Sequence, residues 1–156
     1  VSITGGSTGQ VLTTNGLGAL SWGTVSGLAG LSTRTTVTTT TASLANNANA
    51  DANITGYKSY VLLKIQTSAA AWVRIYSDAA SRTADASRTS NTDPAPGAGI
   101  IAEVITTSAQ TILISPGSYG FNNESTPTTT IPVNITNLSG SAAAITVTLT
   151  VLQLEA

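Results

Sequence analysis

The segment from Ile145 to Val151 alternates strictly between an aliphatic residue and threonine. Successive side chains of a β-strand point to opposite faces of the sheet, so this period of two predicts one buried aliphatic face and one face covered with hydroxyl groups. A period of two also runs through residues 60–65, 71–76, 100–105 and 131–136, and a shorter case at 112–114 precedes Pro116 and Gly117. The chain is therefore expected to be all-β.

Together with a threonine-rich segment at 34–41, these patterns predict about seven strands, at spacings typical of a single β-sandwich or jelly-roll-like domain. No segment predicts a helix. Asparagines within residues 42–54 favour turns. Pro132 predicts that its strand lies at a sheet edge, because proline has no amide hydrogen for the ladder. The connection from Ser77 to Gly99 is longer than usual, which is typical of a functional or mobile loop.

The composition narrows the classes of partner. Apolar residues make up 41% of the chain, aromatic residues 4% and charged residues 8%, so we expect an aliphatic core beneath a hydroxyl-rich surface. Six basic and seven acidic side chains give a net charge of -1, and they form no basic stripe. Nucleic acid is therefore not expected as a partner. No apolar stretch approaches the length of about 18 residues that a membrane helix needs, so membrane insertion is not expected either.

Catalysis has few candidate groups in this chain. Histidine and cysteine are absent, which removes the commonest base, the thiol nucleophile and nearly all transition-metal sites. Among the carboxylates only Glu103 lies on a strand pattern, without a second one spaced to reach the same face. Asp51 opens a D-x-N-x-T-G run like that of a calcium loop, but Leu62 stands where a bidentate glutamate is expected. We predict no enzyme, no metal site and no cofactor.

The first 32 residues differ from the rest, and we expect a glycine-rich assembly segment at 1–32 before a β-sandwich domain at 33–156. Asn15-Gly16 is a type I′ hairpin signal. An isolated hairpin is marginal in water, so its apolar side chains need a partner surface, either the following domain or the same segment of neighbouring subunits around a three-fold axis. The predicted assembly residues are Val11, Leu12, Leu17, Leu20, Trp22 and Val25.

Two further regions are candidates for surface recognition. Tyr119 and Phe121 lie among glycines and asparagines, which suits stacking on a sugar, although rings of this size more often plug one end of a sandwich. Trp72 and Tyr76 share a strand face and are open to either sheet packing or an exposed contact surface. Alternating charges between residues 74 and 93 favour a solvated loop with weak ion pairs over a recognition loop.

Residues 5–25, GGSTGQVLTTNGLGALSWGTV, resemble a segment that recurs in tail fibres and other appendage proteins of tailed bacteriophages. The pattern is G-x-x-G-Q-V-L-x-x-N-G, then small residues, then Trp-Gly. Three later stretches, 56–78, 94–107 and 139–156, look like a small β-domain of virion structural proteins from cyanobacterial phages. The resemblance implies an assembled, non-catalytic virion component, often homotrimeric, and it supplies no site residues.

The leading hypothesis is a homotrimeric tail-fibre or appendage module, located in the virion after assembly in the host cytoplasm. Its expected partners are further copies of itself and other virion proteins, with a host-surface glycan as a candidate ligand. One alternative is a capsid decoration or cement protein whose N-terminal segment orders against the shell. A second is a carbohydrate-binding module.

Overall fold

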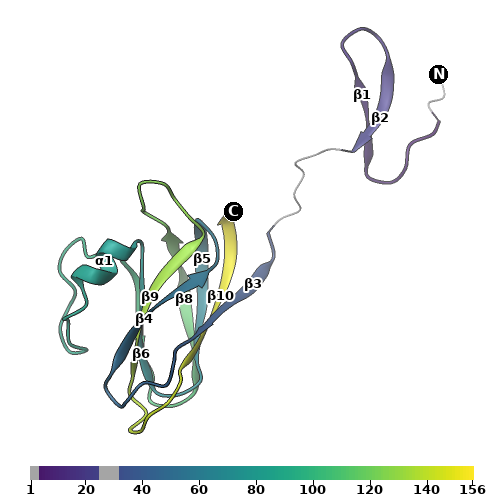
Figure 1. Cartoon of the computed structure of the whole chain (residues 1–156). Helices are drawn as coiled ribbons and strands as arrows, with labels where there is room; N and C mark the ends of the chain where they lie inside the picture. Colours follow the sequence, from purple (N-terminus) through teal and green to yellow (C-terminus); the bar gives the residue numbers. More distant parts are fainter. Residues whose placement is uncertain (1–3, 25–31) are drawn as a thin grey trace. The chain divides into compact units, whose positions relative to one another are not determined.

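The computed structural model describes residues 4–24 and 32–156 (Figure 1). The chain divides into two compact units, Val1–Ser32 and Thr33–Ala156. The first holds strands β1 (Gln10–Thr14) and β2 (Leu20–Thr24). The second holds β3 (Arg34–Thr40), β4 (Asn49–Thr55), β5 (Ser59–Thr67), β6 (Ala71–Tyr76), a short helix α1 (Ala79–Ala84), β7 (Ile100–Ile105), β8 (Gln110–Phe121), β9 (Thr130–Asn137) and β10 (Thr146–Glu155).

The second unit is a β-sandwich, as the alternation predicts. One antiparallel sheet has the strand order β3-β10-β5-β8, and the other has the order β4-β9-β6-β7. The pairing is nested: β3 pairs with β10, β4 with β9, β5 with β8 and β6 with β7. The eight strands therefore pair like the two arms of one long hairpin. The first arm runs from β3 to β6, the chain turns back between β6 and β7, and the second arm returns from β7 to β10.

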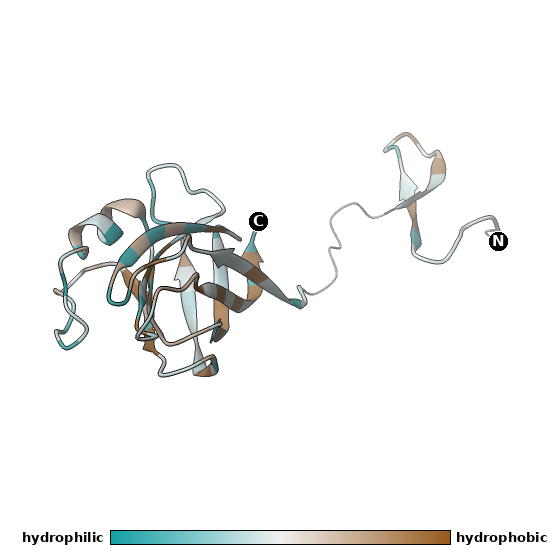
Figure 2. Ribbon diagram, turned by 60° about the horizontal axis from the view of Figure 1, so that its bottom comes forward, coloured by the Kyte–Doolittle hydropathy of each residue, from teal (hydrophilic) through white to brown (hydrophobic). Residues whose placement is uncertain are grey.

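Aliphatic side chains fill the space between the sheets. Val147, Leu149 and Val151 of β10 are fully buried, while the threonines between them lie on the outer face. Figure 2 shows this alternation as bands of hydrophobic and hydrophilic colour along the strands. Thr38 and Thr148 lie opposite each other on neighbouring strands, and their hydroxyl oxygens are 3.0 Å apart. Hydroxyl pairs of this kind link β3 to β10 on the solvent side.

Three expectations about the strands are wrong. Residues 49–55 form β4 where turns were predicted, because alternate residues up to the buried Ile54 face the core and pair with β9. Pro132 lies in the inner strand β9, which is possible because the pairing of β9 with β6 ends at Val133. The short strand expected before Pro116 instead continues to Phe121 as β8. It passes through a bulge, in which residues 114–117 lie opposite the single residue Leu63 of β5.

The expected absence of a helix is also wrong, because α1 lies in the long connection after β6. Its N-terminus is capped by Asp78, whose extended backbone lets the carboxylate accept a hydrogen bond of 2.6 Å from the Ser81 amide. The helix spans six residues, which is too short to leave an amphipathic pattern in the sequence. Among the described residues no helix is long and apolar enough to cross a membrane.

Leu149 and Leu154 on β10 provide a matched test of this core. Leu149 is fully buried between the sheets, whereas Leu154 is 52% exposed. Leu149→Ala leaves a cavity and is expected to lower the free energy of unfolding by about 2–5 kcal/mol. Leu154→Ala should change it by less than about 0.5 kcal/mol. Urea unfolding followed by circular dichroism measures both values, and equal losses would contradict the assignment of the two faces.

Candidate functional site

The N-terminal unit presents apolar side chains on one face of a hairpin. Leu12 lies opposite Trp22, and Leu20 is diagonal to Leu12, so the three residues share a face. Leu12 is 37% and Leu20 61% exposed. The Trp22 ring is partly covered by the backbone of Gly6, where an added Cβ would lie 2.7 Å from the ring. We call Leu12, Leu20 and Trp22 the hairpin face.

The other predicted assembly residues are placed differently. Val11 is 42% exposed but lies opposite Gly23 on the reverse face of the hairpin. Leu17, at 91% exposed, is at the tip. Val25 lies outside the described residues. The structure therefore brings together three of the six predicted residues.

The hairpin turn differs from the predicted type I′ geometry. Five residues, 15–19, connect the strands in place of two. The side-chain oxygen of Asn15 accepts hydrogen bonds from the amides of Leu17 at 2.9 Å and Ala19 at 3.2 Å. Gly16 and Gly18 both have positive φ, a region that glycine adopts without steric cost. The asparagine thus organises a wider loop through its side chain.

Trp72 and Tyr76 do not form an exposed surface. They are 4% and 1% exposed, although they point away from the core on the outer face of β6, because the connection 77–99 covers them. The guanidinium carbon of Arg74 lies 3.9 Å from the centre of the Trp72 ring, and that of Arg88 lies 5.0 Å away. The two aromatic residues are thus part of the packing beneath the loop.

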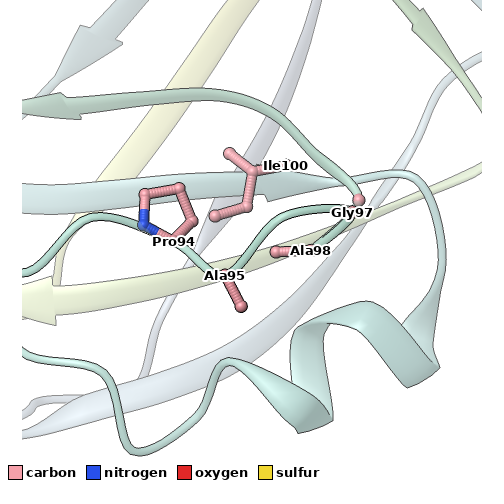
Figure 3. Close-up of a pocket in the computed structure, with 6 residues that line it drawn as sticks. Pro94, Ala95, Gly97, Ala98 and Ile100 are labelled. Atoms are coloured by element: carbon pink, nitrogen blue, oxygen red, sulfur yellow. The ribbon is translucent and has the colours of Figure 1, made fainter.

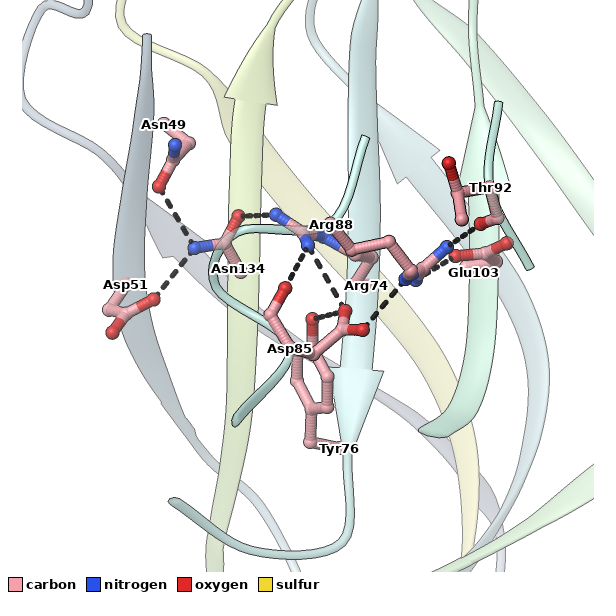
Figure 4. Close-up of polar contacts among 9 residues, drawn as sticks. All are labelled: Asn49, Asp51, Arg74, Tyr76, Asp85, Arg88, Thr92, Glu103 and Asn134. Carbon is pink, nitrogen blue, oxygen red and sulfur yellow. Dashed lines mark hydrogen bonds and ion pairs between the residues drawn. The ribbon is translucent and has the colours of Figure 1, made fainter. Parts of the chain in front are cut away.

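The charges of this loop form a buried network centred on Asp85 (Figure 4). Its carboxylate accepts hydrogen bonds from Arg88 Nε at 2.7 Å, from the Tyr76 hydroxyl at 2.7 Å and from Arg74 Nη1 at 3.1 Å. The side chains of Arg74 and Asp85 are 1% and 5% exposed. The expectation of a solvated loop with weak ion pairs is therefore wrong, since these pairs are shielded from water.

The network also reaches neighbouring strands. Arg74 donates to the side-chain oxygen of Asn134 on β9, and the Asn134 amide donates to Asp51 on β4 at 2.7 Å. Arg88 forms an ion pair with Glu103 on β7. The loop is thus connected through side chains to all four strands of the sheet β4-β9-β6-β7.

These contacts set the ionisation of Asp85. Burial by itself would raise the pKa of the carboxyl group, but the hydrogen bonds from Arg88, Tyr76 and Arg74 outweigh this effect, so the pKa lies below its ordinary value. The pKa of Asp78 is also lowered, mainly by its hydrogen bond with the Ser81 amide.

Several carboxylates have structural partners, among them Glu103 and Asp51, the two considered for catalysis and calcium. Glu103 is paired with Arg88, and a Glu124 oxygen accepts a hydrogen bond from the Ala79 amide at 3.0 Å. Asp51 lies on a strand, and its oxygens face Asn134 and Arg82. In the described parts of the chain no three acidic side chains gather in a way that could hold a metal ion.

Tyr119 and Phe121, by contrast, are exposed at 74% and 52%, so the expectation that they plug the sandwich is wrong. Both lie at the end of β8 on its outer face. Gly120 between them faces inward, where the ring of Tyr60 occupies the space that a side chain would need: an added Cβ would overlap Tyr60 Cζ. This close approach fixes which face of β8 carries the two exposed rings.

The two rings line a cleft, which we call the aromatic cleft. Its volume is about 220 Å³, and its other lining residues are Ser77, Gly99, Ile100 and Ile101. A second cleft of about 270 Å³ shares Gly99 and Ile100 and is lined further by Pro94, Ala95, Gly97 and Ala98 (Figure 3). None of residues 94–101 was among the predicted site residues, although the connection from Ser77 to Gly99 was expected to be functional or mobile. The run Pro-Gly-Ala-Gly before an apolar strand is the local signal that could have indicated a turn beside the strand end.

Comparisons of the chain with protein-family models, curated proteins and solved structures find no match.

Asp85→Asn tests the buried network. Removing the charge leaves Arg74 and Arg88 buried without their shared counter-ion, which is expected to lower the free energy of unfolding by about 3–5 kcal/mol at neutral pH. Asp93→Asn is the matched control, because Asp93 lies in the same connection but is exposed and should change stability by less than about 0.5 kcal/mol. Chemical unfolding at pH 7 measures both, and a similar loss in the two variants would contradict the network.

The lowered pKa of Asp85 also predicts a pH dependence. A carboxyl group whose pKa is lower in the folded state stabilises the fold above its unfolded pKa of about 3.9, and this stabilisation is lost as the pH falls through the folded value. The parent protein should therefore lose stability below about pH 4. Asp85→Asn lacks this component, so the stability difference between the two proteins should shrink on acidification. A difference that stays constant from pH 7 to pH 2 would show that Asp85 does not titrate in this way.

Proposed function

We propose that this protein is a non-enzymatic structural component of a bacteriophage virion, of the tail-fibre or appendage type, and that it assembles as a homotrimer through its N-terminal hairpin. The observation that carries the proposal is the hairpin face. Leu12, Leu20 and Trp22 lie together on one side of a two-stranded sheet, with the two leucines 37% and 61% exposed.

A second copy of the same hairpin is the occupant we assign to this face. A two-stranded hairpin is at best marginally stable alone in water, and contiguous exposed apolar groups on a protein surface mark an interaction surface. Three hairpins around one axis would bury the hairpin face of each copy. The net charge of -1 for the whole chain makes electrostatic repulsion between copies small.

The sandwich supports a virion role in a second way. Nested pairing of eight strands, from the outer pair β3 with β10 to the inner pair β6 with β7, is the arrangement expected of a jelly roll, which we propose for this domain. Jelly rolls are common among viral capsid and lectin domains. The likeness of residues 5–25 to a segment of phage appendage proteins points in the same direction.

Leu20→Asp tests the assembly. Three carboxylates brought into an apolar interface would be unpaired and desolvated, so the full-length variant should be monomeric where the parent protein is trimeric. Ser21→Asp is the matched control, because Ser21 is adjacent in sequence and lies on the reverse face; this variant should remain a trimer. Multi-angle light scattering after size-exclusion chromatography measures the mass. A monomeric parent protein would rule out the proposal.

The position in the particle is a separate test. Gold-labelled antibodies against the sandwich domain should bind to the tail or its fibres on intact phage particles. Labelling spread over the head would instead favour a capsid decoration protein, and particles without the protein would rule out a virion component.

A further inference from the structure

Tyr119 and Phe121 are exposed aromatic side chains of the sandwich domain that lie outside its hydrophobic core. They follow each other on the outer face of β8, at 74% and 52% exposed, because the contact between Gly120 and Tyr60 directs the intervening residue inward. Exposing two large rings side by side to water is unfavourable without a compensating contact. This points to a ligand that lies against the ring faces.

The aromatic cleft beside these rings is uncharged. None of the described residues that line it, or the second cleft that continues from it, carries a formal charge. An ionic ligand would find no counter-ion among these residues, and a nucleic acid would find no cation for its phosphates. Each cleft is also smaller than the about 300 Å³ typical of pockets that enclose drug-sized apolar ligands. A neutral ligand that lies across an open surface fits these walls.

Polar groups lie next to the rings. Tyr119 carries its hydroxyl at the end of its exposed ring, whereas Ser77, which also lines the cleft, is buried and its hydroxyl donates to Asp78 at 2.9 Å. Asn123 follows Phe121 by two positions and is exposed, and its main chain is held beside the cleft because its backbone N–H donates to the Ser77 carbonyl at 2.8 Å. The site therefore combines flat apolar faces with hydroxyl and amide groups that donate and accept hydrogen bonds.

The walls of the cleft are held in place before any ligand arrives. The Ser77 amide donates to the Gly99 carbonyl at 2.8 Å, which joins the end of β6 to the start of β7. Asn122 is buried and donates from its side chain to the Thr130 carbonyl at 2.9 Å. Gly99 has a positive φ, and an added Cβ would overlap Ser81 Oγ. A preformed site of this kind loses little conformational entropy on binding.

We propose that the aromatic cleft binds a neutral saccharide, whose ring stacks its C–H face on Tyr119 and Phe121 while its hydroxyl groups bond to Asn123 and the Tyr119 hydroxyl. A neutral pyranose has an apolar face that suits the aromatic rings and a rim of hydroxyl groups that suits the neighbouring polar groups. It carries no charge, which suits the uncharged lining of the cleft. The site lies within one chain and does not depend on the trimer proposed above.

The test uses the full-length protein and a panel of neutral oligosaccharides: chitotriose, maltotriose, mannotriose and lactose. Isothermal titration calorimetry measures affinity, and ¹H–¹⁵N correlation spectra identify the shifted residues. At least one sugar should bind and shift the amides of residues 119–123 and 99–101. Tyr119→Ala should weaken that binding about fivefold or more, by analogy with the loss seen when an aromatic ring is removed from beneath a stacked nucleic-acid base.

Two control variants separate stacking from folding. Tyr119→Phe keeps the ring and should retain most of the affinity, because it removes only the hydroxyl group and its hydrogen bond to the sugar. Leu113→Ala removes a side chain that is 67% exposed on the same strand but does not line the cleft, and it should bind like the parent protein. Thermal unfolding of each variant checks that the sandwich is intact.

Absence of binding to every member of the panel would overturn the inference, as would a bound sugar whose affinity is the same in Tyr119→Ala. Chemical shifts confined to the N-terminal unit would overturn it too. Light scattering on the same samples reports the oligomeric state, so a failure of saccharide binding and a failure of trimer formation can be distinguished.

Discussion

The carboxylate of Asp85 joins the long connection between β6 and β7 to the sheet beneath it. It accepts hydrogen bonds from two arginines and a tyrosine, and its side chain is 5% exposed. A buried ionic cluster is not in itself a source of stability, because well-packed apolar residues of similar volume often stabilise a protein as much or more. We infer that its contribution is to specify a single conformation for residues 77–99. That conformation covers Trp72 and Tyr76 and places Gly99 and Ile100 at the wall of the aromatic cleft.

The strands that could be predicted from the sequence are those with one aliphatic and one polar face. Residues 145–151 are the clear case, because a period of two reports burial on one side directly. Strand β4 was not predicted because its inward residues are mostly alanines and its outward ones include asparagine, a composition shared with turns. The prediction from Pro132 failed for another reason: what matters is whether its nitrogen faces a paired strand, and this depends on where the ladder with β6 ends.

The ionic network could not be found by local reasoning, since Arg74, Asp85 and Glu103 meet only after β6, α1 and β7 have folded together. The concentration of charge between residues 74 and 93 in a chain with few charges did indicate an unusual segment. It did not reveal whether that segment was exposed. The buried state of Trp72 and Tyr76 depends on the same tertiary contact, so the sequence alone left their strand face ambiguous.

Gly120 determines the direction in which the side chains of its neighbours Tyr119 and Phe121 point. Large rings near the end of a sandwich usually enter the core, but here the position between them is glycine, and the ring of Tyr60 fills the inward space across the strand pair. Alternation along β8 then directs both rings outward. The sandwich thus closes its core at this point with one aromatic side chain from β5, while β8 presents two of its own to solvent. Because the packing of the core and the exposure of the rings follow from one contact, any change that loosens Tyr60 against Gly120 should alter the surface as well as the interior.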